Sequence, residues 1–361
     1  MLEADVQVTL DGGSYRLRAA LGGSAYGLVW RAEAPGGAPD VALKLINRAQ
    51  MARAPAGQQQ RWIASAHKER AFLASLAPWD ERHIVRLLDS GMHEGLPVLA
   101  LELLGPDLGR HLASERNAGR ALPFGQVLDW MEQVNQALAK VHQVGWHYLD
   151  LKPANLLLGQ DGGVKLADFG TSRLRGAGPA ADYAGTASWQ APEQFFPDHN
   201  GHYAVSRRSD YFALGAMLYF LVTGGLPLRF CSDCGQAYRE HGTAAAQALR
   251  ARYQGSLPAT LREDEAALFV HRIDTPWLGA RDATWYPGAR RSHSGSCEAL
   301  ALLRMLLAPV PEQRPEHALQ ISRMLAAARA GTLAAHPAKS ARPLTHAVRT
   351  ASRAHTAGSP A

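Results

Sequence analysis

The segment Trp146–Leu158 reads WHYLDLKPANLLL, and it places three polar side chains of different chemistry in front of an apolar run. Asp150, Lys152 and Asn155 stand in one short loop. A carboxylate can act as a base, an ammonium group can neutralise a migrating phosphoryl group, and an amide oxygen can bind Mg²⁺. The segment therefore raises the question of whether Asp150 is a catalytic base.

A second oxygen ligand follows in VKLADFG, where Asp168 stands directly after an apolar run. Asn155 and Asp168 together could hold Mg²⁺ for phosphoryl transfer. The purely structural alternative makes DLKPAN an Asx-turn and DFG a tight hairpin. That alternative does not explain why both segments occur in this order and at this spacing, so the pair favours phosphoryl transfer.

Upstream, Leu21–Trp30 reads LGGSAYGLVW, a glycine-rich turn between two predicted strands. Because glycine has no side chain, the backbone N–H groups of such a turn can approach phosphates. Only Gly22 and Gly27 match a G-x-G-x-x-G pattern, since Ser24 stands where the second glycine would be. The turn alone does not identify a nucleotide site.

Lys44 ends the segment VALK on an apolar strand, where an ammonium group needs a partner. Glu69, on the following predicted helix, is one candidate partner, and the phosphates of ATP are another. A lone strand lysine could instead reach solvent through its flexible stem.

The 361 residues are enough for two lobes with extensions. The first hundred residues alternate short apolar runs with turns, which predicts an antiparallel sheet of about five strands, interrupted by one helix over 61–76. Beyond Glu102 the pattern becomes helical, with helices predicted over 124–144, 211–223, 297–307 and 318–330. We therefore expect an α+β fold in which a small β lobe precedes a larger helical lobe.

These motifs, taken in order, resemble the protein kinase family over residues 15–330. GTASWQAPE, SDYFALG and PEQRP follow DFG and look like later landmarks of the same family. The resemblance implies a bilobal kinase fold, with a first strand or extension over 1–14, an N-lobe over 15–104 and a C-lobe over 105–330. It also implies ATP and Mg²⁺ as cofactors and a protein as substrate.

The resemblance further implies a role for each matching residue. Asp150 would accept the proton of the substrate hydroxyl, Lys152 would neutralise the phosphoryl group, and Asn155 and Asp168 would hold Mg²⁺. Lys44 would pair with Glu69 and bind the α and β phosphates. The nucleotide would also contact Leu21, Gly22, Gly27, Val29, Ala42, Glu102, Leu104 and Asp107, with Asp107 near the ribose. Glu193 and Arg314 would form an ion pair beneath the activation segment, which runs from Asp168 to Glu193. Asp210 would hold the catalytic loop, the loop that carries Asp150, Lys152 and Asn155.

Where the family usually has His-Arg-Asp, this chain has Tyr148, Leu149 and Asp150. Tyr148 can still pack beneath DFG, but Leu149 cannot bind a phosphorylated activation loop as arginine does. We therefore expect activity that does not depend on phosphorylation of that loop, with a protein partner as a possible activator. Lys152, together with Thr186 before WQAPE, resembles the serine/threonine branch. A pseudokinase that acts as a binding module and a small-molecule phosphotransferase of related fold are the alternatives.

The segment 229–296 is weakly periodic and is expected to be an insertion in the C-lobe. Cys231 and Cys234 have C-x-x-C spacing, and His293 and Cys297 have H-x-x-x-C spacing, so the four could bind zinc. His241 is a rival ligand. Free buried cysteines are an equally good interpretation.

The N-terminus MLEADVQVTLDGG lacks the basic and apolar regions of a signal peptide, so a cytoplasmic location is expected. The charge-free stretch 211–228 is broken by glycine and proline, which favours a core helix over a membrane span. The net charge is +6, and the segment 331–361 has basic residues and no acidic ones. We expect that segment to be a disordered, solvated tail, and we do not expect nucleic acid as a partner.

Overall fold

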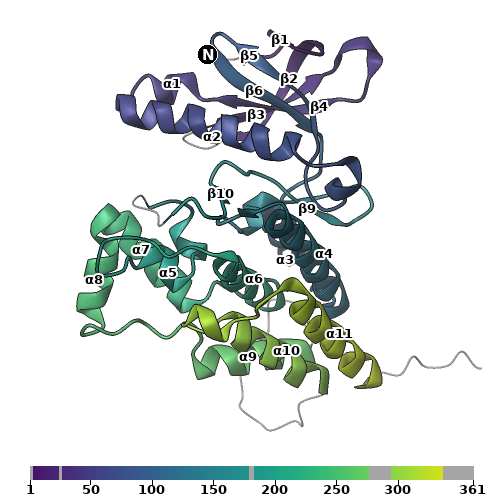
Figure 1. Ribbon diagram of the computed structural model, residues 1–361. Helices are drawn as coiled ribbons and strands as arrows, with labels where there is room; N and C mark the ends of the chain where they lie inside the picture. Colours follow the sequence, from purple (N-terminus) through teal and green to yellow (C-terminus); the bar gives the residue numbers. More distant parts are fainter. Residues whose placement is uncertain (1–2, 24–26, 179–182, 276–293, 336–361) are drawn as a thin grey trace, which may run out of the picture.

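The computed structural model describes residues 3–23, 27–178, 183–275 and 294–335. A small lobe built on a sheet lies above a larger lobe built of helices, and the chain passes between them after β6 (Leu96–Glu102) (Figure 1). The predicted α+β, two-lobed fold is therefore confirmed.

The small lobe contains one antiparallel sheet of six strands in the order β1-β2-β3-β4-β6-β5. Alternate residues of its strands point to one face of the sheet and form a hydrophobic core there, because side chains on a strand alternate between its two faces. Two helices, α1 (Arg48–Met51) and α2 (Ala56–Ala74), follow β4. The other strands are β1 (Gln7–Leu10), β2 (Gly13–Gly23), β3 (Gly27–Glu33), β4 (Val41–Ile46) and β5 (Leu87–His93).

The large lobe is organised around α6 (Arg207–Val222), whose residues from Ser209 to Tyr219 are all buried. This helix contains most of the charge-free stretch and is the core helix that the sequence predicted. No helix in the described parts of the chain is both long enough and apolar enough to cross a membrane. Around α6 lie α3 (Leu108–Asn117), α4 (Phe124–Gln143), α5 (Pro192–Phe195), α10 (Ser294–Leu306) and α11 (Ala318–Ala335).

Two short antiparallel strand pairs hold the segments that contain DLKPAN and DFG. β8 (Leu156–Leu158) pairs with β9 (Val164–Leu166), which sets the loop before β8 and the loop after β9 side by side. β7 (Trp146–His147) pairs with β10 (Arg173–Leu174), so the segments before and after the two loops are joined as well.

The segment 229–275 is mostly helical, although its sequence gave only weak periodicity. It forms α7 (Arg229–His241), α8 (Ala245–Arg252) and α9 (Glu263–Asp274). Phe230 and Phe269 from this segment are fully buried in the main core. Residues 276–293 lie outside the described parts.

The expected tail needs one correction, because α11 continues beyond residue 330 to Ala335. Ser294 Oγ donates a hydrogen bond to the Gly331 carbonyl, so the last turns of α11 lie against the beginning of α10. The remainder of the expected tail, 336–361, lies outside the described residues.

Candidate active site

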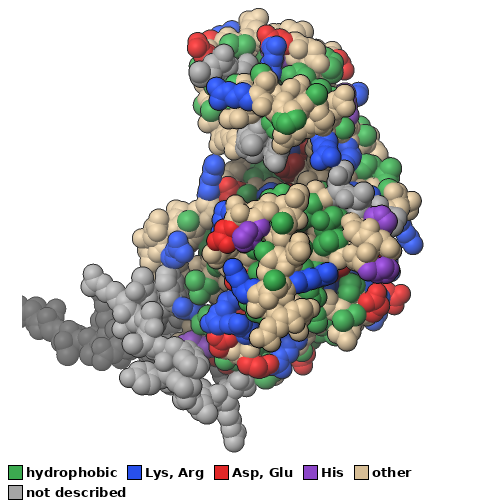
Figure 2. All heavy atoms as spheres, turned by 90° about the vertical axis from the view of Figure 1, so that its left-hand side faces the viewer, with side chains coloured by type: hydrophobic (Ala, Val, Ile, Leu, Met, Phe, Trp, Pro, Cys, Tyr) green, Lys and Arg blue, Asp and Glu red, His purple; other side chains and the backbone are tan. Residues whose placement is uncertain are grey.

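The recess between the two lobes collects the charged residues of the sequence motifs, and acidic and basic side chains are visible in it in the space-filling view (Figure 2). Lys44 lies on β4, where it is paired in register with Val29 on β3 and Leu99 on β6. Its Nζ is 2.6 Å from Glu69 Oε2 and 2.9 Å from Asp168 Oδ1. The structure therefore brings together a cation from the sheet, an acid from α2 and an acid from the large lobe.

Burial and charge act in opposite directions on these three groups. Burial alone would lower the pKa of Lys44, but the carboxylates of Asp168 and Glu69 outweigh it and raise that pKa above its usual value. Burial also opposes ionisation of Asp168, yet the Lys44 ammonium group lowers the pKa of Asp168 overall. For Glu69 burial is the larger influence and raises the pKa, in spite of Lys44. Lys44 and Asp168 are consequently held in their charged forms.

Asp150 lies at the centre of the catalytic-loop cluster, and its two carboxylate oxygens have different partners. Oδ1 accepts a hydrogen bond of 2.7 Å from Thr186 Oγ1, and Oδ2 accepts one of 2.7 Å from Lys152 Nζ. Lys152 Nζ is also 2.8 Å from Thr186 Oγ1, which closes the triangle. Asn155 Nδ2 donates to the backbone carbonyl of Asp150 at 2.9 Å. Thr186 thus contacts both Asp150 and Lys152.

Burial raises the pKa of Asp150, while the Lys152 cation and the hydrogen bonds from Lys152 and Thr186 lower it, and the net direction is upward. A carboxylate with a raised pKa is a stronger base than an ordinary one. The cluster is therefore suited to accepting a proton from a hydroxyl group.

The backbone of the catalytic loop is fixed by Asp210 of α6, as the sequence implied. Asp210 Oδ2 accepts from Tyr148 N at 2.9 Å, and Oδ1 accepts from Leu149 N at 2.6 Å. These bonds hold Leu149 at φ 68°, a left-handed conformation that is unfavourable for a residue with a side chain. Asp168 also has a positive φ, of 62°. Asp210 thus stabilises a loop whose shape the local sequence would not adopt by itself.

Tyr148 occupies the position beneath DFG that the sequence analysis assigned to it. Its hydroxyl donates to the Ala167 carbonyl at 2.5 Å, and its ring meets Phe169 edge to face at 5.2 Å between centroids. Phe169 in turn stacks on Phe72 of α2 at 4.3 Å. A continuous aromatic column therefore connects the catalytic loop with the helix that carries Glu69.

The residues expected to contact a nucleotide come from the strands β2, β3, β4 and β6 of the small lobe and from the segment that leads into α3. Leu21 and Gly22 lie on β2 and Val29 lies on β3, and Gly22 pairs with Val29. Asp107 lies in the segment before α3, where it bridges to Leu157 and caps α3 by accepting from Arg110 N at 2.9 Å. Gly27 begins β3, Ala42 lies on β4, Glu102 ends β6 and Leu104 lies just beyond β6, whereas Ser24 lies outside the described residues.

Arg110 is a residue of this region that the sequence reasoning missed. Its Nη1 donates to the Leu21 carbonyl at 3.3 Å, and its Nε lies 3.2 Å from Asp107 Oδ2. The side chain therefore links the glycine-rich turn to α3. Its position three residues after Asp107 could have predicted the pairing of Arg110 with Asp107. The contact with Leu21 could not be predicted, because it depends on how the lobes face each other.

The base of the activation segment is held by neutral groups and by one buried ion pair. Gln194 Nε2 donates to the Leu149 carbonyl at 3.2 Å. Arg314 binds Glu193 through two hydrogen bonds of 2.7 and 2.9 Å and lies over the Phe212 ring. The predicted pairing of Glu193 with Arg314 is thereby confirmed.

Tyr183, just after the part of the activation segment that is not described, joins a cluster of rings. It stacks on Tyr238 of α7 at 4.7 Å and meets Phe195 and Tyr203 edge to face. Burial raises the pKa of Tyr183, so its hydroxyl stays protonated. Packing against α7 thus orders the end of the segment.

The proposed zinc site is not supported. Cys231 and Cys234 lie on α7 with buried side chains, while Cys297 is exposed on α10. Burial raises the pKa of Cys231 to about 12 and raises that of Cys234 as well. Among the described residues, Cys231, Cys234, Cys297 and His241 do not form a group with the spacing of a metal site. His293 lies outside the described residues, and the rival His241 is exposed beside Glu240. The interpretation of the pair on α7 as buried free cysteines is the one that fits.

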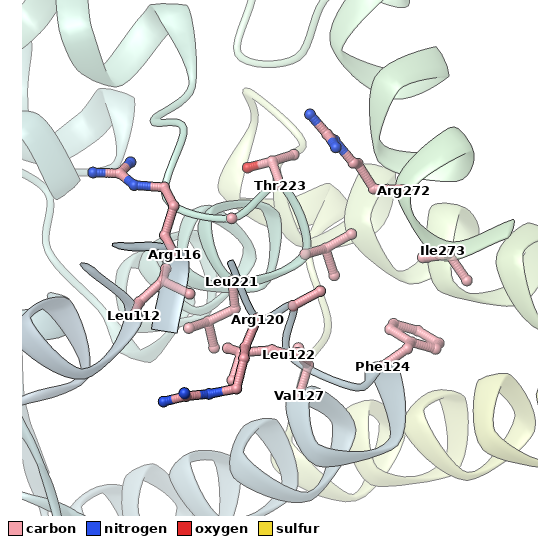
Figure 3. Close-up of a pocket in the computed structure, with 13 residues that line it drawn as sticks. Leu112, Arg116, Arg120, Leu122, Phe124, Val127, Leu221, Thr223, Arg272 and Ile273 are labelled. Atoms are coloured by element: carbon pink, nitrogen blue, oxygen red, sulfur yellow. The ribbon is translucent and has the colours of Figure 1, made fainter. Parts of the chain in front are cut away.

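A second depression, on the large lobe, was not found from sequence (Figure 3). Its floor is apolar and includes Leu112, Leu122 and Phe124, and the arginines Arg116 and Arg120 lie at its edge. It contains none of the charged residues of the recess between the lobes. It therefore has no direct part in the chemistry of Asp150.

Comparison with known proteins agrees with this geometry. The chain is 33% identical over 168 residues to the serine/threonine-protein kinase PknL of Mycobacterium tuberculosis, which is 46% of this chain and 40% of PknL. It is 35% identical over 234 residues to the serine/threonine-protein kinase PkaA of Streptomyces coelicolor, which is 60% of this chain and 40% of PkaA. The chain thus spans less than half the length of these relatives. The protein kinase domain profile matches residues 15–325. This chain therefore belongs to the protein kinase family.

Proposed function

We propose that this chain is an active protein serine/threonine kinase that transfers the γ-phosphate of ATP to Ser or Thr hydroxyls of protein substrates. The observation that carries the proposal is the cluster of Asp150, Lys152 and Thr186, in which each carboxylate oxygen of Asp150 has a donor at 2.7 Å. A base, its orienting groups and a cation for the phosphoryl group are present in one loop.

The proton of the substrate hydroxyl would move to Asp150 as its oxygen attacks phosphorus. Burial makes Asp150 more basic, and Lys152 keeps it ionised until the proton arrives. Lys152 also lies where it can neutralise the phosphoryl group, as in other phosphoryl-transfer sites. Thr186, from the activation segment, makes the position of this base depend on an ordered segment.

The residues for Mg²⁺ and ATP fit those ligands. Asn155 uses Nδ2 to donate to Asp150, which leaves Oδ1 as its metal-binding atom. Asp168 uses Oδ1 to bind Lys44 and has a partly exposed side chain, so its carboxylate can also bind a hard cation. Mg²⁺ would neutralise phosphate charge, while Lys44, held by Glu69, would bind the α and β phosphates.

Purified protein should be incubated with labelled ATP, Mg²⁺ and a generic acceptor protein, and the labelled amino acids should then be identified. We expect phosphoserine or phosphothreonine. Asp168→Ala should reduce the rate by at least about 10²-fold, because one metal ligand is lost. Asp161→Ala, an exposed acidic residue in the turn between β8 and β9, is the matched control and should retain activity.

Two results would contradict the proposal. Equal turnover by the parent and Asp168→Ala proteins would show that the activity does not come from this site. Stabilisation of the parent by ATP without any phosphoryl transfer would favour the pseudokinase alternative, in which the chain only binds nucleotide. Labelling of small molecules but of no protein would favour the third alternative.

A further inference from the structure

We propose that His142, His147 and Asp210 form a binding site for a zinc-class transition-metal ion on the far side of the catalytic loop. The three residues come from the end of α4, from β7 and from the first turn of α6. One ligand atom from each lies within 4.8 Å of the other two. Among the described residues, this is the group of histidine, cysteine and acidic side chains with the spacing of a metal site.

The bonding of these side chains leaves room for a metal. His142 Nε2 lies 2.8 Å from Asp210 Oδ2. The Nδ1 atoms of His142 and His147 are both buried and have no hydrogen-bond partner among the described residues. Buried imidazole nitrogens normally have partners, because an unpaired polar atom in the interior is costly. His142 faces Asp210 with Nε2, so its Nδ1 lies on the other side of the ring and cannot bind the same ion. The buried, unpaired Nδ1 of His147 is the feature that a bound ion would explain.

The site has a route to solvent. His142 and His147 line a wide cavity whose wall also includes Arg175, Arg207 and His202. A metal ion can enter through this cavity, and water can fill the coordination position that three protein ligands leave open. Two histidines and one carboxylate form a ligand set found in open, tetrahedral zinc sites.

The surroundings decide which class of ion fits. Arg175 and Arg207 line the same cavity as His142 and His147. They disfavour Mg²⁺ and Ca²⁺, which bind mainly through charge and prefer sets of oxygen ligands. Zinc and neighbouring transition metals gain most from imidazole nitrogen, so they tolerate the two arginines better.

Binding would act on catalysis through Asp210. The same Oδ2 atom that would bind the ion accepts the hydrogen bond from Tyr148 N. An ion that withdraws Oδ2 weakens the support of the loop that carries Asp150. Zinc should therefore inhibit, and this consequence rests on the proposed kinase function, whereas metal binding does not.

The test is a zinc titration of tag-free, metal-stripped chain against a colorimetric zinc chelator, in the presence of excess Mg²⁺. We expect one high-affinity zinc ion per chain, with X-ray absorption showing nitrogen and oxygen ligands. His147→Leu and His142→Gln should each weaken binding by about 10²-fold or more, because loss of even a supporting residue commonly costs 10- to 100-fold. His271→Gln, at an exposed histidine on α9, is the matched control and should bind zinc like the parent.

Absence of tight zinc binding by the parent would overturn the proposal. Sulfur in the first coordination shell, or loss of binding in a Cys231→Ser, Cys234→Ser double variant with retention in His147→Leu, would move the site to the cysteines and also overturn it. If both histidine variants fail to fold, the X-ray absorption spectrum of the parent still decides, since only the proposed site predicts two imidazoles and no sulfur. Inhibition by zinc in the parent and not in His147→Leu would add the link to activity.

Discussion

The catalytic recess and the base of the activation segment lie on either side of Asp150, and they are held together by different forces. In the recess, Lys44 connects two carboxylates, those of Glu69 and Asp168, at 2.6 and 2.9 Å. At the base of the activation segment, Leu149 replaces a charged residue, and its carbonyl accepts a hydrogen bond from neutral Gln194. The end of that segment is packed by the rings around Tyr183.

The difference separates the residues proposed for phosphoryl transfer from the residues that hold the activation segment. Charges are retained where a phosphoryl group would need them, because an electrostatic site in a low-dielectric recess stabilises developing charge strongly. Leu149 brings no charge to the position where the kinase family usually has an arginine that can bind a phosphate on the activation segment. Ser172 is fully buried, and the buried hydroxyl of Thr171 has no partner among the described residues, so neither is readily accessible for modification.

The largest expected effect is on the recess. Lys44→Ala should lower the phosphorylation rate by about 10³-fold, since it removes the phosphate-binding cation and leaves the buried Glu69 without its partner. Steady-state kinetics with saturating ATP measures the change, and a melting curve verifies folding. Lys165→Met, which removes a lysine of β9 that binds Glu102 at 2.6 Å, is the control for loss of a paired strand lysine. An equal loss in both variants would show that the effect is structural.

Lys152→Met should have the next largest effect and should also change the pH dependence. Lys152 lowers the pKa of Asp150, so its removal lets burial raise that pKa further. Asp150 must be unprotonated to act as a base, and the acidic limb of the kcat/KM profile should therefore move to higher pH. The rate at neutral pH should fall by about 10²-fold. A lower rate with an unmoved acidic limb would show that Asp150 is not the titrating base.

Tyr183→Ala tests whether packing orders the activation segment. Each ring contact contributes about 0.5–1.5 kcal/mol, so losing three contacts should disorder the segment enough to reduce the rate about tenfold. Tyr183→Phe is the matched control. It keeps the ring and removes a buried hydroxyl that has no partner in the described part of the chain, so its rate should equal that of the parent. The opposite ranking would mean that the hydroxyl, and not the ring, is needed.

The smallest expected effect is that of phosphatase treatment. Because Leu149 provides no cation for a phosphate, treated and untreated protein should differ by less than about threefold in rate. Ser172→Ala and Ser188→Ala should behave in the same way. A fall in rate of about 10²-fold on dephosphorylation would show that a cation other than one at position 149 binds the phosphate. The contrast between the two regions would then be wrong.

The two-lobed fold and the charged residues that meet in the recess could be predicted from the sequence. Asp150, Lys152 and Asn155 are close in the chain, so their contacts follow from one loop, and the periodicity of the flanking segments predicted the helices that carry it. The pairing of Lys44 with Glu69 could be predicted because an ammonium group on a buried strand needs an acid. The structure does not support the zinc site that the cysteine spacing suggested, since that spacing does not reveal that α7 turns both thiols into the core.

Several contacts between residues that are far apart in the chain followed from the tertiary structure and not from the motifs. Arg110 reaches Leu21 across the recess, Tyr183 meets Tyr238, and His142 meets Asp210 across 68 positions. Each contact depends on the angle and distance at which whole elements pack, and these follow from the summed burial of many side chains. No local pattern encodes such a sum, which is why the motifs of this kinase-family chain predicted the charged residues of the recess but not these contacts.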